Sequence, residues 1–256
     1  MVKIGGALLE SAELRQRWAR AIAALVAQGH RVAAVHGGGS SLTRTLQLLG
    51  KQSQFVNGLR VTDAETRDAA LMVLAGLINK QLVAALAEVG QSAVGLCGGD
   101  GLTFRARRRA GEVDLGYVGE ISASNPALLH AIWQQQAVPL IASIALGEDG
   151  QYYNVNADSM AAACAVASGA ALLAFVTDVP GVWNSAGQVI QRLTLGEVDG
   201  LKASGAVKGG MLPKLEACSR ALSGGVGRVH IMPGATMEAL EQLGRGPISV
   251  GTELIA

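Results

Sequence analysis

The chain has few of the residues that mark secreted, disulfide-linked or metal-binding proteins. Only three of its 256 residues are cysteines (Cys97, Cys164 and Cys218), and they lie far apart in apolar stretches. There is no CxxC motif and no pattern of a disulfide framework, so we expect buried, reduced thiols and a cytoplasmic protein. The four histidines show no metal-ligand spacing. We therefore expect no metal site formed by protein side chains.

The chain also has little net charge and few aromatic residues. A formal charge of +1 and 4% aromatics give no general attraction to nucleic acid or to membranes. The one basic run, Arg105 with Arg107–Arg109, is interpreted as a solvated hairpin tip. Residues 159–177 carry no charge over about the length of a membrane span, but Ser168-Gly169 interrupts them. We predict a helix followed by a strand there, and no secretory signal at the N-terminus.

What the chain does have is an apolar half and 34 glycines, three of them in one cluster. The apolar run Val32–Val35 leads into Gly37-Gly38-Gly39, and a helical pattern follows. Without side chains, such a turn lets backbone N–H groups approach a ligand, and the helix adds the positive end of its dipole. The turn therefore suits a phosphate or a carboxylate. A turn that binds no ligand fits this stretch equally well.

Strand and helix patterns alternate along the chain, which predicts an α/β fold with a mainly parallel sheet. Both glycine clusters follow strands, so we expect them at the carboxyl edge of the sheet, where ligands bind in such folds. Two capping boxes are predicted, beginning at Thr62 and Thr194. The apolar pattern that ends at Gly90 predicts one long helix or two, and Leu71, Leu74, Ile78 and Leu82 on it are interpreted as a possible dimer face. The strands are expected at residues 1–4, 31–35, 92–97, 138–146, 171–177, 228–231 and 248–255, with helices at 14–29, 39–49, 64–90, 125–136, 159–168, 211–222 and 236–243.

Three ionisable residues stand out near predicted strand ends and helix starts. Lys3 lies in an otherwise apolar strand, and lysine is rarely buried without a partner. Lys214 lies at a helix start, where the dipole disfavours a cation, so an anionic ligand would explain it. Asp158 also begins a helix, where a carboxylate is favourable on its own. Each residue therefore also has an ordinary structural explanation: an edge-strand lysine, a solvated lysine and a helix-start carboxylate.

Several enzyme classes are excluded by missing motifs. The sequence has no Walker A pattern, no GxGxxG after a strand and no GxSxG. Two lysines, one aspartate and many backbone N–H groups, without an evident nucleophile, suit phosphoryl transfer, which depends on positioning and charge stabilisation.

Seven stretches together resemble the amino acid kinase family, in the family's order and over nearly the whole chain. They are residues 3–6 (KIGG), 36–39 (HGGG), 57–63 (NGLRVTD), 118–120 (VGE), 154–158 (NVNAD), 177–182 (TDVPGV) and 209–214 (GGMLPK). The resemblance implies a three-layer αβα sandwich around a mainly parallel open sheet. It divides the single domain into residues 1–169, for substrate binding and dimerisation, and residues 170–256, for nucleotide binding.

The resemblance also implies a reaction. The branch of the family that these stretches match best phosphorylates the side-chain carboxylate of N-acetyl-L-glutamate, using ATP and Mg²⁺, in arginine biosynthesis. Lys3 and Lys214 would stabilise the transferring phosphoryl group, and Asp158 would orient both lysines. Gly37, Gly38, Arg60 and Asn154 would bind the substrate. The nucleotide would be bound by Gly5, Gly6, Asp178, Val179, Pro180, Gly181, Val182, Trp183, Ala206, Val207 and Lys208.

Some features depart from the family pattern, and rival activities stay open. Gly98-Gly99-Asp100 lacks a lysine that the family often has, and Met232-Pro233-Gly234 lacks an aspartate. The stretch after Leu243 is short. The resemblance also implies that arginine-inhibited members carry an extra N-terminal helix that joins dimers into a hexamer. Because this sequence begins directly at the first strand, we expect a homodimer that arginine does not inhibit. The rivals are a sister kinase acting on an aminoadipate derivative and a catalytically silent ligand-binding regulator of the same fold.

Overall fold

The computed structural model describes residues 1–203, 207, 209–242 and 250–256. Its main sheet has the strand order β12-β14-β13-β11-β1-β2-β8-β5. Only the β13–β14 pair of this sheet is antiparallel. In that order the strands are Arg192–Thr194, Thr252–Ile255, Arg228–Pro233, Leu172–Thr177, Val2–Ile4, Ala34–His36, Val138–Ala142 and Ala93–Cys97. The predicted mainly parallel sheet is thus confirmed.

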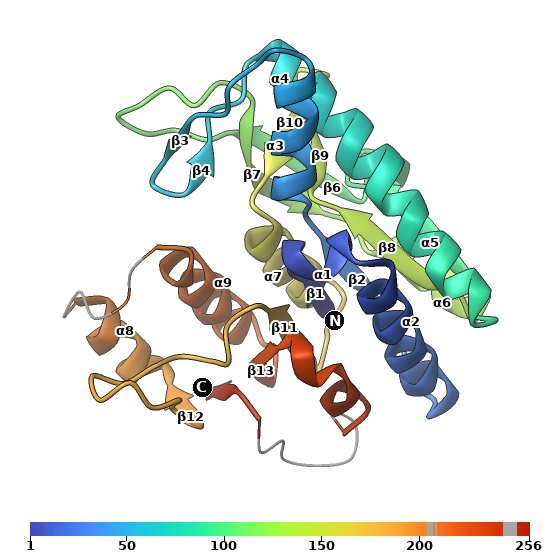
Figure 1. Ribbon diagram of the computed structural model, residues 1–256, viewed down its shortest axis with the longest axis vertical. Coiled ribbons are helices and arrows are strands. Elements are labelled where there is room, and N and C mark those ends of the chain that lie inside the picture. Colours follow the sequence, from blue (N-terminus) through green and yellow to red (C-terminus); the bar gives the residue numbers. More distant parts are fainter. Residues whose placement is uncertain (204–206, 208, 243–249) are drawn as a thin grey trace.

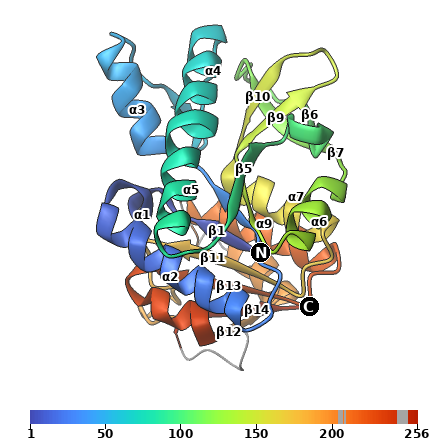
Figure 2. The same ribbon diagram turned by 90° about the vertical axis from the view of Figure 1, so that its right-hand side faces the viewer.

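Helices cover both faces of this sheet, as the two views show (Figures 1 and 2). Each set of helices shares a buried apolar cluster with one face. The expected three-layer sandwich is therefore confirmed. One layer contains α1 (Gly6–Glu10), α2 (Ala12–Ala27), α3 (Gly39–Leu48), the π-helix η1 (Leu71–Ile78), α5 (Asn79–Glu88) and the 3-10 helix η3 (Gly234–Gln242); the other contains α6 (Ala127–Gln134), α7 (Ala157–Ala167), α8 (Leu195–Ala203) and α9 (Met211–Ser223).

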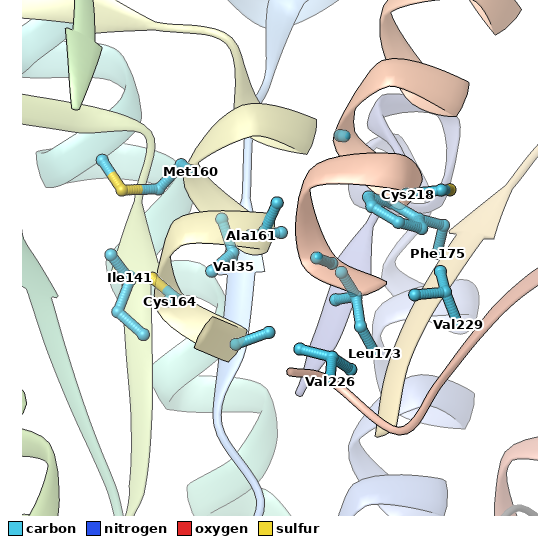
Figure 3. Close-up of a cluster of buried hydrophobic side chains, with 14 of the residues drawn as sticks. Val35, Ile141, Met160, Ala161, Cys164, Leu173, Phe175, Cys218, Val226 and Val229 are labelled. Carbon is cyan, nitrogen blue, oxygen red and sulfur yellow. The ribbon is translucent and has the colours of Figure 1, made fainter. Parts of the chain in front are cut away.

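Side-chain alternation in β1 decides which residues meet which layer. Val2 and Ile4 belong to the first cluster, so Lys3, between them, faces the second layer. There it lies between Val35 of β2 and Phe175 of β11 in the ladder register. Figure 3 shows this second cluster, where helices α7 and α9 pack over the sheet. A lysine on this face needs a buried anionic partner.

The cysteines lie in this packed interior, as the sequence predicts. Cys97, Cys164 and Cys218 are all buried and free, and two of them appear in Figure 3. Burial raises the pKa of the Cys97 thiol to about 11 and raises the pKa of Cys164 and Cys218 further. These thiols therefore pack as small apolar groups.

A second, smaller β-structure lies beyond the end of the sheet. The strands β6 (Phe104–Arg108), β7 (Val118–Ser124), β9 (Ile144–Gly147) and β10 (Tyr152–Val155) close into a four-stranded barrel, and β3 (Phe55–Val56) pairs with β4 (Leu59–Arg60) in a hairpin. The single strand predicted for residues 138–146 is wrong, because Ser143 divides it into β8 and β9. The Ser143 N–H donates to the His36 carbonyl of the sheet, while its own carbonyl accepts from Val155 of the barrel.

The basic run lies on this barrel and is neutralised locally. Arg108 donates to both oxygens of Asp114 at 2.7 Å, and Arg107 and Arg109 pair with Glu120. The predicted solvated hairpin tip is confirmed for Arg107–Arg109, which are exposed, but it is wrong for Arg105, which is half-buried and donates to the Gly147 carbonyl at 3.2 Å.

The two predicted capping boxes have different outcomes. The helix α4 (Ala64–Ala70) is capped by Asp63, whose carboxylate accepts from the Thr66 N–H, while the Thr62 hydroxyl donates to the Arg60 carbonyl. The box beginning at Thr62 is therefore wrong by one residue. The box at Thr194 is confirmed, because Glu197 accepts from the Thr194 N–H and Thr194 accepts from the Glu197 N–H.

The long helix from Ala64 to Glu88 is continuous through α4, η1 and α5. Its proposed dimer face is wrong, because Leu74, Ile78 and Leu82 are buried in the first apolar cluster. By length and composition alone this helix could cross a membrane, but half of its most apolar window is buried inside the molecule. Buried core helices of other proteins have the same length and composition, and we interpret this helix as a core element.

The end of the chain is described only in part. The helix predicted for residues 236–243 is a 3-10 helix that ends at Gln242, and the last strand begins at Thr252. Residues 248 and 249 of the predicted strand, and Leu243, lie outside the described residues.

Candidate active site

Asp158 holds its side chain between the two lysines that the sequence singles out. It lies in the first turn of α7, whose N-cap is Asn156; the Asn156 side chain accepts from the N–H groups of Asp158 and Ser159 at 3.0 Å. This cap fixes where the helix begins. The buried carboxylate therefore projects from a fixed helix end toward β1 and α9.

Lys3 and Lys214 reach this carboxylate from different elements. The Lys3 Nζ lies 2.8 Å from Asp158 Oδ1, and the Lys214 Nζ lies 2.9 Å from Oδ2. Lys214 comes from the first turn of α9, and its Nζ also lies 5.1 Å from the centre of the Phe175 ring. All three charged side chains are buried. One carboxylate thus orients two ammonium groups and leaves a net positive charge.

The electrostatics of this trio follow from burial and charge. Burial favours the neutral form of Lys3 and lowers its pKa, since the attraction of Asp158 offsets this only partly. Burial opposes ionisation of Asp158, but Lys3 and Lys214 outweigh it and lower the pKa of that carboxylate. Asp158 is therefore ionised at neutral pH. A buried cationic pair of this kind can stabilise the charge of a phosphoryl group.

The glycine clusters lie beside the trio, at the carboxyl ends of β1 and β2. The Gly5 N–H donates to the Val176 carbonyl at 2.7 Å, and a Cβ on Gly5 would lie 2.9 Å from that oxygen. A Cβ on Gly37 would lie 3.2 Å from the Cβ of Ala157, the neighbour of Asp158. Only glycine allows the backbone of both turns to approach so closely.

Arg60 is tied to the helix that follows the second glycine cluster. Its guanidinium donates to the Gly39 carbonyl at 2.9 Å, to Thr43 Oγ1 at 2.8 Å and to Ser53 Oγ, and it lies over the ring of Phe55. Three of the five guanidinium N–H groups are used. The other two have no acceptor among the described residues.

Asn154 lies on β10 and reaches the same region through one hydroxyl. Its Nδ2 donates to Thr62 Oγ1 at 3.4 Å, and Thr62 in turn donates to the Arg60 carbonyl at 2.8 Å. The structure thus links the predicted substrate-binding residues Arg60 and Asn154 through Thr62, a buried residue to which the sequence analysis assigned no role at the site.

A cavity of about 540 Å³ borders the trio. Asp158 and Lys214 line one end of it, beside the loop that follows β11. Predicted nucleotide residues that line it are Asp178, Val179, Gly181, Val182, Trp183 and Val207. Pro180 is exposed and does not line it. Ala206 and Lys208 lie outside the described residues.

The loop between β11 and β12 is held by backbone and hydroxyl contacts. The Val182 N–H donates to Thr252 Oγ1 at 2.8 Å, and Gly181 has a φ of +157°. The indole of Trp183 is 56% exposed. A large aromatic side chain left open at the edge of a cavity suits stacking with a ligand base.

Other residues of the site were not predicted from the sequence. Thr177, Gly210 and Met211 also line the cavity. Their positions, at the end of a predicted strand and at the start of a predicted helix, were the sequence features that could have indicated them. Asn79 contacts His36 beneath the second glycine cluster, and no motif pointed to it.

Comparison with known proteins agrees with this geometry. The chain is 58% identical over 256 residues to a protein from Acidobacterium capsulatum named acetylglutamate kinase, covering 100% of this chain and 98% of that one. It is 53% identical over 256 residues to a protein of the same name from Koribacter versatilis, with the same coverage.

A solved structure has the same fold. The N-acetylglutamate synthase from Neisseria gonorrhoeae, complexed with coenzyme A and N-acetyl-glutamate, superposes with a TM-score of 0.87 at 25% sequence identity. The match covers 100% of this chain and 58% of that one. A model of the amino acid kinase family matches residues 1–233. The chain therefore belongs to the amino acid kinase family.

Proposed function

We propose that this protein transfers the γ-phosphoryl group of ATP to the side-chain carboxylate of N-acetyl-L-glutamate, in arginine biosynthesis. The observation that carries the proposal is the buried trio, in which Asp158 holds Lys3 and Lys214 at 2.8 and 2.9 Å beside a cavity. The relatives named acetylglutamate kinase, at 58% and 53% identity over the full chain, support the choice of acceptor.

In this mechanism the substrate carboxylate attacks the γ-phosphorus and the bond to the β–γ bridging oxygen breaks. The products are an acyl phosphate and ADP. A side-chain carboxylate is already ionised at neutral pH, so no general base is needed. Lys3 and Lys214 stabilise the charge on the transferring group, and Asp158 keeps both ammonium groups oriented. N–H groups of the two glycine turns add further donors.

The two halves of the chain divide the binding work in this proposal. Residues 1–169 bind the acceptor, whose α-carboxylate meets the free N–H groups of Arg60 and the amide of Asn154. Residues 170–256 bind ATP in the cavity beside Trp183. The described residues contain no cluster of three or more His, Cys, Asp or Glu side chains able to hold a metal ion. Mg²⁺ therefore arrives as MgATP, coordinated mainly by phosphate oxygens and water.

We further propose that the protein works as a cytoplasmic homodimer. Two large apolar side chains of the long helix, Met72 and Leu77, are 62% and 55% exposed, and Val94 on the edge strand β5 is also exposed. A second copy would bury these residues. Light scattering tests this: a monomer, or a dimer unchanged by Met72→Glu with Leu77→Glu, contradicts it.

The acceptor is tested by measuring ADP release from MgATP with a panel of carboxylates: N-acetyl-L-glutamate, L-glutamate, N-acetyl-L-aspartate and L-aminoadipate. We expect turnover with N-acetyl-L-glutamate and at least about tenfold less with the others. N-acetyl-L-aspartate and L-aminoadipate change the distance from the α-carboxylate to the phosphorus that Arg60 and Asn154 would fix, and L-glutamate carries a charged ammonium group in place of the acetylated nitrogen. A preference for aminoadipate would indicate the sister kinase. ATP binding without turnover on any acceptor would indicate the regulator.

A further inference from the structure

The imidazole of His36 lies wholly buried beneath the second glycine turn, and the mechanism above does not use it. Its Nδ1 is 2.9 Å from the Gly37 carbonyl oxygen, and its Nε2 is 3.0 Å from Asn79 Nδ2. A carbonyl oxygen only accepts, so Nδ1 carries the proton and Nε2 accepts from Asn79. Burial lowers the pKa of His36 to about 4. The ring is therefore neutral at physiological pH, in a single tautomer.

Both polar atoms of the Asn79 side chain form hydrogen bonds. Its Nδ2 also donates to the Leu140 carbonyl at 3.0 Å, and its Oδ1 accepts from Lys80 Nζ at 3.2 Å. Lys80 also donates to the Gly95 carbonyl at 3.1 Å. A buried amide is costly unless it is hydrogen-bonded in this way. The amide of Asn79 therefore has one fixed orientation, with its N–H directed at His36.

The helix supports this arrangement through its backbone. The π-helix Leu71–Ile78 ends directly before Asn79. A π-helix uses more residues per turn than an α-helix, so it changes the direction in which the residues after it project. Ile78 packs on the glycine turn from the same side: a Cβ on Gly38 would lie 2.1 Å from Ile78 Cδ1. One helix segment thus holds the turn by packing and by hydrogen bonding.

The consequence for the turn follows from the planar trans peptide. In such a peptide the carbonyl and the next N–H point in opposite directions. Because the Gly37 carbonyl is directed at the buried His36 ring, the Gly38 N–H is directed away from it. Among the residues that the structure describes, this N–H has no acceptor. Gly37 also lies against Ala157, next to Asp158.

We propose that His36 and Asn79 are positioning residues of the phosphoryl-transfer site: Asn79 orients the His36 ring, and the ring holds the Gly37–Gly38 peptide so that the Gly38 N–H faces the reacting group. This inference rests on the proposed function, because it assigns the Gly38 N–H to an anionic substrate group in the transition state.

Two substitutions of His36 separate positioning from simple packing. The amide nitrogen of an asparagine side chain takes the place of Nδ1 and can still donate to the Gly37 carbonyl. The amide nitrogen of a glutamine side chain takes the place of Nε2, so it leaves that carbonyl without its donor. We therefore expect His36→Asn to keep kcat within about threefold, whereas His36→Gln and Asn79→Leu lower kcat roughly tenfold or more with little change in either KM. Leu82→Ala is the matched control on the same helix; it lowers Tm but not kcat. Equal kcat for the Asn and Gln variants overturns the proposal.

A second measurement needs no substrate. In protein labelled with ¹⁵N-histidine, the His36 ring is expected to show a protonated Nδ1 and an unprotonated Nε2 between about pH 6 and 8, and Asn79→Leu should shift the Nε2 resonance. The opposite tautomer overturns the proposal. If the wild-type protein phosphorylates another acceptor, the proposed function fails, and the kcat comparison is made on that acceptor instead.

Discussion

Lys3 and Lys214 bind different oxygen atoms of one carboxylate, that of Asp158, at 2.8 and 2.9 Å. The first lysine comes from the first strand of the chain and the second from a helix near its end. The two halves of the domain therefore meet in a single charged group. If these halves bind acceptor and nucleotide, as proposed, the phosphoryl group crosses between them at this point.

Removal of either lysine tests this arrangement. We expect Lys3→Ala and Lys214→Ala each to lower kcat by roughly 10²–10³, the loss typical of one preorganised donor. The KM values should change far less, because the ammonium charge acts mainly in the transition state. Lys202→Ala, on the outer helix α8, is the control and should retain wild-type kcat. Near-normal turnover in both site variants would remove the lysines from the mechanism.

Asp158→Asn is expected to reduce both activity and stability. It leaves two buried ammonium groups without a counter-charge, and losing one partner of a buried ion pair costs about 3–5 kcal/mol. Urea denaturation measures the loss in the free energy of unfolding. The double variant Asp158→Asn with Lys3→Met should recover part of this stability, because it removes one unpaired cation, but it should stay inactive. No recovery would show that the stability loss has another cause.

The stability of the protein should depend on pH through His36. Burial lowers its pKa to about 4 in the folded state, below the unfolded value near 6.5. The folded state therefore loses stability as the pH falls from 6.5 toward 4, by about 3 kcal/mol in total. Urea denaturation of the wild type and of His36→Asn over this range isolates the effect, since His230 remains in both proteins. Parallel curves would mean that His36 does not titrate in this way.

Asp63 should stabilise the long helix by capping it. Asp63→Ala is expected to cost about 1 kcal/mol, and Asp63→Asn much less, because an amide oxygen can also accept from Thr66. The hydrogen bond from Lys51, then that from Thr66, lowers the pKa of Asp63 to about 2. The benefit of the carboxylate is therefore complete above about pH 4 and is lost as the pH falls toward 2. Thermal unfolding at several pH values measures it; equal Tm values for Ala and Asn at pH 7 would contradict the cap.

Trp183 should contribute to nucleotide affinity. Trp183→Ala is expected to raise the KM for ATP roughly tenfold, within the range of base–aromatic stacking, and to leave the KM for the acceptor unchanged. Trp133→Phe, whose indole donates to the Val32 carbonyl and does not line the cavity, serves as the control. Because the chain has three tryptophans, quenching of protein fluorescence by ATP that is present in the wild type and lost in Trp183→Ala gives the same information. An unchanged KM for ATP would place the base elsewhere.

Local patterns in the sequence sufficed for the alternation of strands and helices and for singling out Lys3, Lys214 and Asp158, whereas the three layers and the pairing of Asp158 with both lysines came from the resemblance to the amino acid kinase family. Lys3 and Lys214 each contradicted their local environment, an apolar strand and a helix start, and this conflict indicated a partner. The division of residues 138–146 between sheet and barrel was not predictable, because it depends on contacts of Ser143 with residues distant in the sequence. Asn79 was missed for the same reason: in an apolar helix its role is set by His36, 43 residues away.

The most direct test of the proposed phosphoryl transfer is to trap its acyl phosphate product. Purified protein, MgATP, N-acetyl-L-glutamate and hydroxylamine are incubated together, and the hydroxamate formed from an acyl phosphate is measured. We expect a hydroxamate that requires both ATP and N-acetyl-L-glutamate and that falls to near background with Lys214→Ala. Release of ADP without hydroxamate, or full hydroxamate formation by Lys214→Ala, would contradict this expectation.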